Sequence, residues 1–350
     1  MGPPVSIKGR GAADNPQGRF ETLARSREAE TEVQSRPETV VTLQLARSII
    51  ARNDSPDLPF AQSINPYQGC EHGCIYCYAR PSHAYLGLSP GLEFETRLFA
   101  KENAAELLRK ELSRPGYRCE LIALGANTDP YQPIEREHRI TRGVLEVLWE
   151  FRNPVGIVTK GSLIERDLDL LAPMAREGLV QVFVSIGSLD GEIARTLEPR
   201  AAAPYRRVET IRRLSESGVP CGTLVAPIIP FLNDKDMEAV LETVSEAGAR
   251  MAGYTLLRLP WEVKDLFKDW LERNYPLKAK HVMARIRDMR GGRDNDPQFG
   301  SRMKGEGQYA ELLARRFELA CKRLGLNAGG RRRPDTAKFR RPGPVQERLF

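Results

Sequence analysis

The stretch SINPYQGCEHGCIYCYAR, residues 63–80, joins a short apolar run to three closely spaced cysteines. We expect residues 63–67 to form a strand. Five similar β-rich runs follow it, at 119–125, 155–160, 180–187, 221–228 and 252–259. Segments with apolar residues at helical spacing lie between them; one contains Val208, Ile211 and Leu214. Strand and helix alternating about six times predict right-handed βαβ units around a parallel sheet. Such a sheet is either doubly wound or curled into a barrel. Of these two α/β folds we favour an incomplete (β/α)6 barrel that resembles a TIM barrel.

Composition is that of a globular protein. The chain has 350 residues, of which 41% are hydrophobic and 28% charged, enough to bury a large core. It has no apolar run of membrane-spanning length, and its start has no apolar signal-peptide core, which predicts a cytoplasmic protein without a membrane segment. We expect four parts: a mobile N-terminal extension over 1–55, a core barrel over 56–290, a glycine-rich loop and helix over 291–328, and a disordered basic tail over 329–350.

Positive charge is concentrated in that tail. The formal net charge is +7, and residues 329–350 contribute +5 of it. A basic tail can bind a polyanion through phosphate contacts, which makes nucleic acid a possible partner. A purely solubilising role explains the same composition equally well.

The three clustered cysteines, Cys70, Cys74 and Cys77, have the spacing C-x3-C-x2-C. A disulfide framework is unexpected in a chain whose core is large enough to stabilise it. Structural zinc usually adds a second Cys or His pair downstream, and the chain has none. A four-iron cluster can be held by three thiolates while its fourth iron stays open to another ligand. The spacing therefore favours an iron–sulfur site.

Polar residues follow the expected strands. Ligand sites in parallel α/β folds lie at the carboxyl ends of the strands. The loops GANTDPYQPIE and TKGSLIERD, which follow the second and third strands, would direct Asp129, Lys160 and Ser162 toward the cysteine loop. The sequence predicts one shared site at this end of the sheet.

These residues carry a family resemblance. CEHGCIYC, with Tyr76 before the last cysteine, resembles the signature of the radical S-adenosylmethionine (SAM) superfamily, and TDPYQPIE, TKGSLIERDLDLL and APIIPFLND resemble its branch related to spore photoproduct lyase. The resemblance covers roughly residues 64–290. It implies a [4Fe–4S] cluster held by the three cysteines, with SAM on the open iron. Reduction by a flavodoxin- or ferredoxin-type donor would cleave SAM to a 5′-deoxyadenosyl radical, which takes hydrogen from a substrate that the sequence does not identify.

The resemblance also places residues around SAM. These are Tyr76 and Tyr78 near the adenine, Thr128 and Asp129 at the methionyl amine, Lys160 and Ser185 at the carboxylate and ribose, and Arg200 as a further carboxylate partner.

Two features separate this chain from the repair enzyme of that branch. The enzyme uses a cysteine just before its Ser-Asp or Thr-Asp pair as a hydrogen donor, whereas Ala126 and Asn127 stand here, which argues against photoproduct repair. Cys221 is the remaining candidate donor. We further expect the segment from Gly300 to Gly307 to be a lid or substrate loop. The alternative function is a non-catalytic, zinc-stabilised nucleic-acid-binding protein that uses the same cysteines.

Overall fold

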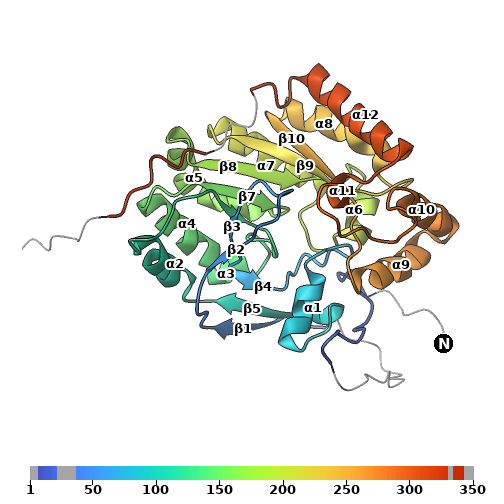
Figure 1. Ribbon diagram of the computed structural model, residues 1–350, viewed down its shortest axis with the longest axis horizontal. Coiled ribbons are helices and arrows are strands. Elements are labelled where there is room, and N and C mark those ends of the chain that lie inside the picture. Colours follow the sequence, from blue (N-terminus) through green and yellow to red (C-terminus); the bar gives the residue numbers. More distant parts are fainter. Residues whose placement is uncertain (1–6, 22–36, 330–333, 343–350) are drawn as a thin grey trace, which may run out of the picture.

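The computed structural model describes residues 7–21, 37–329 and 334–342 (Figure 1). Its strands are β1 (Val40–Gln44), β2 (Ile50–Arg52), β3 (Gln62–Ile64), β4 (Tyr67–Gln68), β5 (Arg97–Lys101), β6 (Ile122–Leu124), β7 (Val155–Thr159), β8 (Val180–Ser185), β9 (Cys221–Ile228) and β10 (Met251–Leu256). Its α-helices are α1 (Leu92–Thr96), α2 (Ala104–Ser113), α3 (Glu135–His138), α4 (Ile140–Glu150), α5 (Leu168–Arg176), α6 (Gly191–Leu197), α7 (Pro204–Glu216), α8 (Met237–Glu246), α9 (Val263–Asn274), α10 (Pro276–Asp288), α11 (Ser301–Lys304) and α12 (Gln308–Leu324). Three 3₁₀ helices complete the described elements: η1 (Arg80–Leu86), η2 (Ser162–Asp167) and η3 (Asp234–Asp236).

The larger sheet has seven strands in the order β10-β9-β8-β7-β6-β3-β2. Neighbouring strands from β3 to β10 pair in parallel, and only β2 is antiparallel to its neighbour β3. The six parallel strands are those expected from the sequence, so the prediction of an incomplete six-stranded barrel is confirmed.

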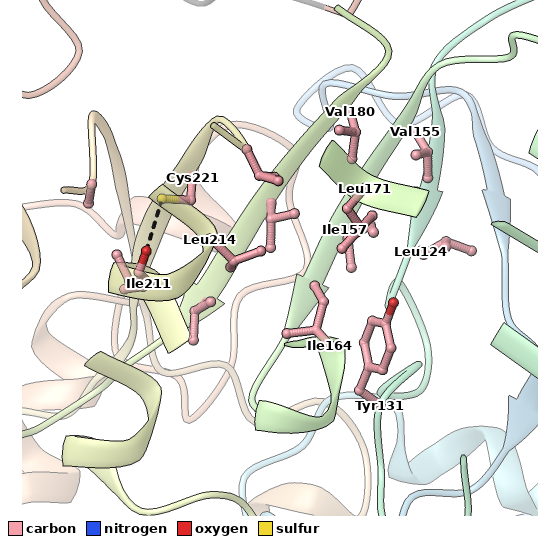
Figure 2. Close-up of a cluster of buried hydrophobic side chains, with 14 of the residues drawn as sticks. Leu124, Tyr131, Val155, Ile157, Ile164, Leu171, Val180, Ile211, Leu214 and Cys221 are labelled. Carbon is pink, nitrogen blue, oxygen red and sulfur yellow. Dashed lines mark hydrogen bonds between the residues drawn. The ribbon is translucent and has the colours of Figure 1, made fainter. Parts of the chain in front are cut away.

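Helices cover the outer face of this sheet. Val208, Ile211 and Leu214, which the sequence places on one face of a helix, are buried in α7. They join the valines and isoleucines of β7, β8 and β9 in one apolar core, part of which Figure 2 shows. Burial of this stripe, more than helix propensity, stabilises helices of this length.

The open side of the barrel is bridged by an ion pair. Asp57 lies between β2 and β3, at one edge of the sheet, and Arg302 lies in α11, which packs on β10 at the other edge. The Arg302 nitrogens Nη2 and Nε lie 2.5 and 2.6 Å from the two Asp57 carboxylate oxygens. A flat sheet of seven strands would hold its edges about 29 Å apart. Contact between segments anchored on both edges therefore reflects a sheet that curls.

The N-terminal part differs from expectation. Residues 1–6 and 22–36 lie outside the described residues, but β1 and β2 both fall within the 1–55 segment that was expected to be mobile. β1 pairs with β5 and β5 with β4 in a second, three-stranded sheet. The expected first strand is also divided between the two sheets, because Pro66, which has no N–H to donate, lies between β3 and β4.

The described part of the basic tail, residues 334–342, lies at the amino ends of the barrel strands. The Arg340 N–H donates to the Phe151 carbonyl just before β7, and the Arg341 guanidinium reaches carbonyls before β6. Phe339 packs against Phe151 and Tyr117, with ring centroids 6.3 and 5.4 Å away. The expectation of a disordered tail is therefore wrong for these residues, because an aromatic side chain anchors them. Residues 330–333 and 343–350 of the tail lie outside the described residues.

A membrane span is not found in the described ranges, where every helix is too short or too polar to cross a bilayer.

Candidate active site

The cysteine loop connects β4 to η1 at the carboxyl end of β3. The Cys70 N–H donates to the Phe94 carbonyl at 3.0 Å, and the Cys77 N–H donates to the Cys74 carbonyl at 3.1 Å. Gly73 has φ +67°, and a Cβ there would lie 2.7 Å from a Glu95 carboxylate oxygen. Only glycine therefore fits at position 73, directly before Cys74, in this conformation.

Arg80, which follows the loop, holds its backbone in place. Its side chain is fully buried and donates to the carbonyls of Cys74 and Gly73, at 2.9 and 3.2 Å, and to that of Pro90 at 3.0 Å. Its charge is balanced by Glu95, which is also fully buried. Neither residue was predicted from the sequence, although an arginine directly after a predicted metal-binding loop is a signal for such a role.

The three thiols suit an iron–sulfur cluster. Cys70 and Cys74 are buried, and Cys77 is half-buried. Burial raises the pKa of Cys70 well above its usual value and that of Cys74 to about 12; neighbouring Lys160 acts in the opposite direction on Cys74. Within the described ranges, no three histidine, cysteine or carboxylate side chains are gathered around one point as a single metal ion needs. In a cluster each thiolate binds a different iron, so that the sulfurs need not converge.

The loop after β6 fastens the cysteine loop to the barrel. The buried Thr128 hydroxyl donates to the Gly69 carbonyl at 2.6 Å, and Gln132 donates to Thr128 at 3.0 Å. The Gln132 amide oxygen accepts the Glu71 N–H at 2.9 Å. Thr128 and Gln132 thus form hydrogen bonds with Gly69 and Glu71, the residues on either side of Cys70. Thr128 lies at the expected site, and its observed contact is with the protein backbone.

Both carboxylate oxygens of Asp129 accept all their hydrogen bonds from protein groups. One carboxylate oxygen accepts from the Thr159 hydroxyl at 2.6 Å and the Tyr131 N–H at 2.9 Å; the other accepts from the Lys160 N–H at 2.7 Å and lies 3.3 Å from His72 Nδ1. Burial alone raises the pKa of Asp129, but His72 and these hydrogen bonds bring it down to about 2. Four donors occupy the lone pairs of both oxygens. In this structure Asp129 positions the end of β7 and the cysteine loop.

Tyr76 belongs to a buried polar network that the sequence did not reveal. Its hydroxyl donates to Glu198, which also pairs with Arg207 of α7. The Lys160 Nζ lies 5.8 Å from the Tyr76 ring centroid. Burial acts to lower the pKa of Lys160, but Cys74 and Glu198 raise it above its usual value. An ammonium group is therefore held beside the cysteine loop.

The remaining expected residues divide between two places. Tyr78 is 48% exposed, and its hydroxyl donates to the Ala126 carbonyl. Ser185 is buried at the carboxyl end of β8. Both lie at the mouth end of the strands. Arg200 instead pairs with Glu71 at 2.6 Å, and both line a cavity of about 600 Å³ beside the loop.

Cys221 is not near this site. It is the first residue of β9, at the amino end of the strand, and its thiol lies 3.6 Å from the Ile211 carbonyl of α7 (Figure 2). The carboxyl end of an eight-residue strand lies about 23 Å away. This placement corrects the assignment of Cys221 as a candidate hydrogen donor, because its side chain faces the helix layer.

The sequence is similar to that of known proteins. The family model of the Radical SAM superfamily matches residues 64–244, from β3 through most of α8. An uncharacterized protein of Mycobacterium tuberculosis (strain ATCC 25618 / H37Rv) is 38% identical over 234 residues, 66% of this chain and 68% of that protein. An uncharacterized protein of Methanocaldococcus jannaschii is 27% identical over 213 residues, 61% of this chain and 76% of that protein.

Solved structures share the fold. Spore photoproduct lyase complexed with dinucleoside spore photoproduct superposes with a TM-score of 0.58 at 16% identity, over 82% of this chain and 80% of that chain. The family match contains the cysteine loop and the strands that surround it. The zinc-stabilised alternative gains no support. The chain belongs to the radical SAM superfamily, and it is an enzyme whose cofactors are a [4Fe–4S] cluster and SAM.

Proposed function

We propose that Cys70, Cys74 and Cys77 hold the cluster and that this site removes hydrogen from a substrate entering at the carboxyl ends of the strands. The observation that carries the proposal is the placement of all three cysteines on one loop, whose Cys74 and Gly69 carbonyls accept hydrogen bonds from the side chains of Arg80 and Thr128. When bound, the cluster supplies the electron that cleaves SAM. The protein must fix SAM in place and exclude water.

Residues at the mouth would bind SAM. We assign the carboxylate to Lys160, whose ammonium charge is kept by Cys74 and Glu198, and the ribose to Ser185. Tyr76 and Tyr78 flank the third cysteine and would lie by the adenine. Thr128, Asp129 and Arg200 make the protein contacts described above, so we assign them to positioning the loop.

Exposed aromatic rings favour nucleic acid as the substrate class. Phe231 follows β9 and Trp261 follows β10, and they are 41% and 64% exposed. Their φ values, +61° and +52°, are strained for bulky side chains, and such strain gathers at functional sites. Each of these rings and that of Tyr78 has an arginine guanidinium beside it, with Arg19 at 4.3 Å from Trp261, Arg285 at 5.8 Å from Phe231 and Arg258 at 5.5 Å from Tyr78. Their exposed parts offer surfaces on which bases can stack. The described tail residues lie at the other end of the barrel and do not contribute to this surface.

The cavity beside the loop suits an acidic electron donor. Besides Arg200 it is lined by Lys8, Arg10, Arg195 and Arg273. A flavodoxin- or ferredoxin-type protein would be steered to this positive surface, next to Glu71 and hence to Cys70. We also propose that the enzyme works in the cytoplasm, because all six cysteines are free.

Anaerobic reconstitution tests this function. We expect about four irons per chain, a brown colour that is lost when all three loop cysteines are replaced by alanine, and 5′-deoxyadenosine formed from SAM after reduction. Nucleic acid, peptide and metabolite fractions from cells grown in deuterated medium then identify the substrate class, because deuterium moves into 5′-deoxyadenosine only from the correct one. A colourless protein that binds one zinc would overturn the proposal.

A further inference from the structure

Arg258 lies at the mouth of the barrel, beside the cysteine loop. It follows the end of β10 by two residues, and the central carbon of its guanidinium is 5.5 Å from the ring centroid of Tyr78. Tyr78 is the residue after Cys77. The last strand of the barrel thus brings a cation next to the loop carried by the first strand.

The Arg258 guanidinium has few partners. In the described part of the chain it forms no ion pair, and its Nε is buried without a hydrogen-bond partner. Its Nη1 lies 3.7 Å from the Met303 sulfur. A thioether is a weak acceptor, whereas a guanidinium carries five N–H donors. Most of the hydrogen-bonding capacity of Arg258 is therefore left for another molecule.

Two other arginines surround it. Arg290 donates to the Leu257 carbonyl at 2.9 Å and to the Ser301 carbonyl at 3.0 Å, and Arg302 is paired with Asp57. Burial lowers the pKa of Arg258, and the positive charge of Arg302 lowers it further. Arg290 thus reaches the residue before Arg258, and Arg302 precedes Met303, which Arg258 contacts; the Asp57 carboxylate offsets part of the charge of Arg302. An anion bound at Arg258 would be stabilised by the positive charge that remains.

The contrast with the structural arginines is informative. Arg80 and Arg290 are more deeply buried than Arg258, and each fills its donors with backbone carbonyls or a carboxylate. A partly buried charge without such partners costs free energy, because the Tyr78 ring and the Met303 sulfur replace only part of the water that it has lost. Arg258 does not serve the fold in the way that these two residues do.

We propose that Arg258 binds an anionic group of the substrate, a phosphate or a carboxylate, between Tyr78 and Met303. Met303 belongs to the glycine-flanked segment from Gly300 to Gly307, which would cover the bound group. The inference rests on the proposed function, since it takes the mouth beside the cysteine loop as the substrate entrance. It narrows the substrate class to molecules that carry an anion near the carbon that loses hydrogen.

Paramagnetic relaxation in the holoenzyme tests this placement. The reduced cluster is paramagnetic, so a bound anion near it relaxes faster. Inorganic phosphate is followed by its ³¹P signal and ¹³C-labelled acetate by its carboxyl signal, each with SAM present. We expect relaxation enhancement for one or both anions, and at least roughly tenfold weaker binding in Arg258→Gln, with partial recovery in Arg258→Lys.

The matched control is Arg341→Gln. The Arg341 guanidinium also lies over an aromatic ring, 5.6 Å from the Phe339 centroid, but it donates to the carbonyls of Arg114 and Pro115 at the opposite end of the barrel. This variant should bind both anions as the wild type does. Enhancement by phosphate alone supports a phosphorylated substrate, and enhancement by acetate alone supports a carboxylate.

Three results would overturn the proposal: no enhancement with either anion, equal enhancement in Arg258→Gln, or an equal loss of SAM affinity in that variant, which would place Arg258 in the SAM site. Calorimetric titration of phosphate and acetate into the same preparations measures anion binding from heat, so this measurement does not depend on a paramagnetic cluster. A protein that assembles no cluster but binds anions through Arg258 would therefore contradict the proposed function and not this subsite.

Discussion

Asp57 and Arg302 are 245 positions apart in the sequence, and they form a two-pronged ion pair across the open side of the barrel. The Gly300 N–H adds a longer contact to Asp57, at 3.4 Å. This pair ties the segment from Gly300 to Gly307 to the edge of the sheet opposite the strand on which α11 packs.

Asp57→Asn should loosen the segment near neutral pH. Arg302 lowers the pKa of Asp57, so the unfolded state takes up the proton first as pH falls. The contribution of the pair is thus complete above the ordinary aspartate pKa, about 4, and is lost as pH falls through the lowered folded-state value. Hydrogen exchange of peptides over 299–304 should be faster in the variant at pH 7, and the difference should shrink in acid. Asp265→Asn, at a 67% exposed side chain 4.0 Å from Lys268, is the control. Equal exchange at pH 7 would contradict the closure.

Glu95→Gln should destabilise the protein strongly. It leaves the buried Arg80 charge without a counterion, and it disturbs the N–H groups of Gly11 and Ala12, which donate to the same carboxylate. Breaking a buried pair costs about 3–5 kcal/mol. Urea unfolding measures this loss, and iron content should fall with it because Arg80 shapes the cysteine loop.

The control for that variant is Glu150→Gln. Glu150 pairs with Arg109 at 2.7 Å on the surface, where the two side chains are 36% and 50% exposed. Removing this pair should cost less than about 1 kcal/mol. Similar losses in the two variants would show that the buried pair has no special role.

Gly305→Ala should cost more than Gly300→Ala. Both glycines have positive φ, +70° and +88°, so both substitutions are strained. A Cβ at Gly305 would also lie 2.9 Å from Leu256 and 3.2 Å from the Met289 carbonyl, whereas one at Gly300 meets nothing within 4 Å. We expect an excess destabilisation of about 1–3 kcal/mol for Gly305→Ala, measured by urea unfolding. Equal values would mean that α11 shifts freely on β10.

Deleting the segment from Gly300 to Gly307 should abolish substrate turnover, and intact turnover would disprove its role as a lid.

Lys160→Met should weaken SAM binding at least roughly tenfold, because it removes a charged hydrogen-bond donor from the mouth. Lys160→Arg should recover part of the affinity. Calorimetric titration of SAM into the reconstituted protein measures the change. Lys101→Met, in β5 of the second sheet, is the control for loss of a lysine away from the mouth. Unchanged affinity in Lys160→Met would remove Lys160 from the site.

Local pattern determined the barrel and the cysteine loop. Apolar runs and helical spacing identify six parallel strands and their covering helices, because burial of one face leaves its period in the sequence. The spacing of Cys70, Cys74 and Cys77 predicts the cluster loop that we propose, because these three candidate ligands are close along the chain. The charge and the prolines of the tail predicted disorder, whereas Phe339 holds residues 334–342 in place by packing against Phe151.

Tertiary structure decided the rest, because it brings together residues that are far apart in the chain. Glu198 reaches Tyr76, Glu95 reaches back to the N-terminal segment, and Arg302 reaches Asp57 only after the sheet curls. Cys221 could face either side of its strand in the sequence; the structure directs it to α7. Strand period marks which residues alternate, but the side that becomes the barrel interior is set by packing between elements, and no local pattern encodes that choice.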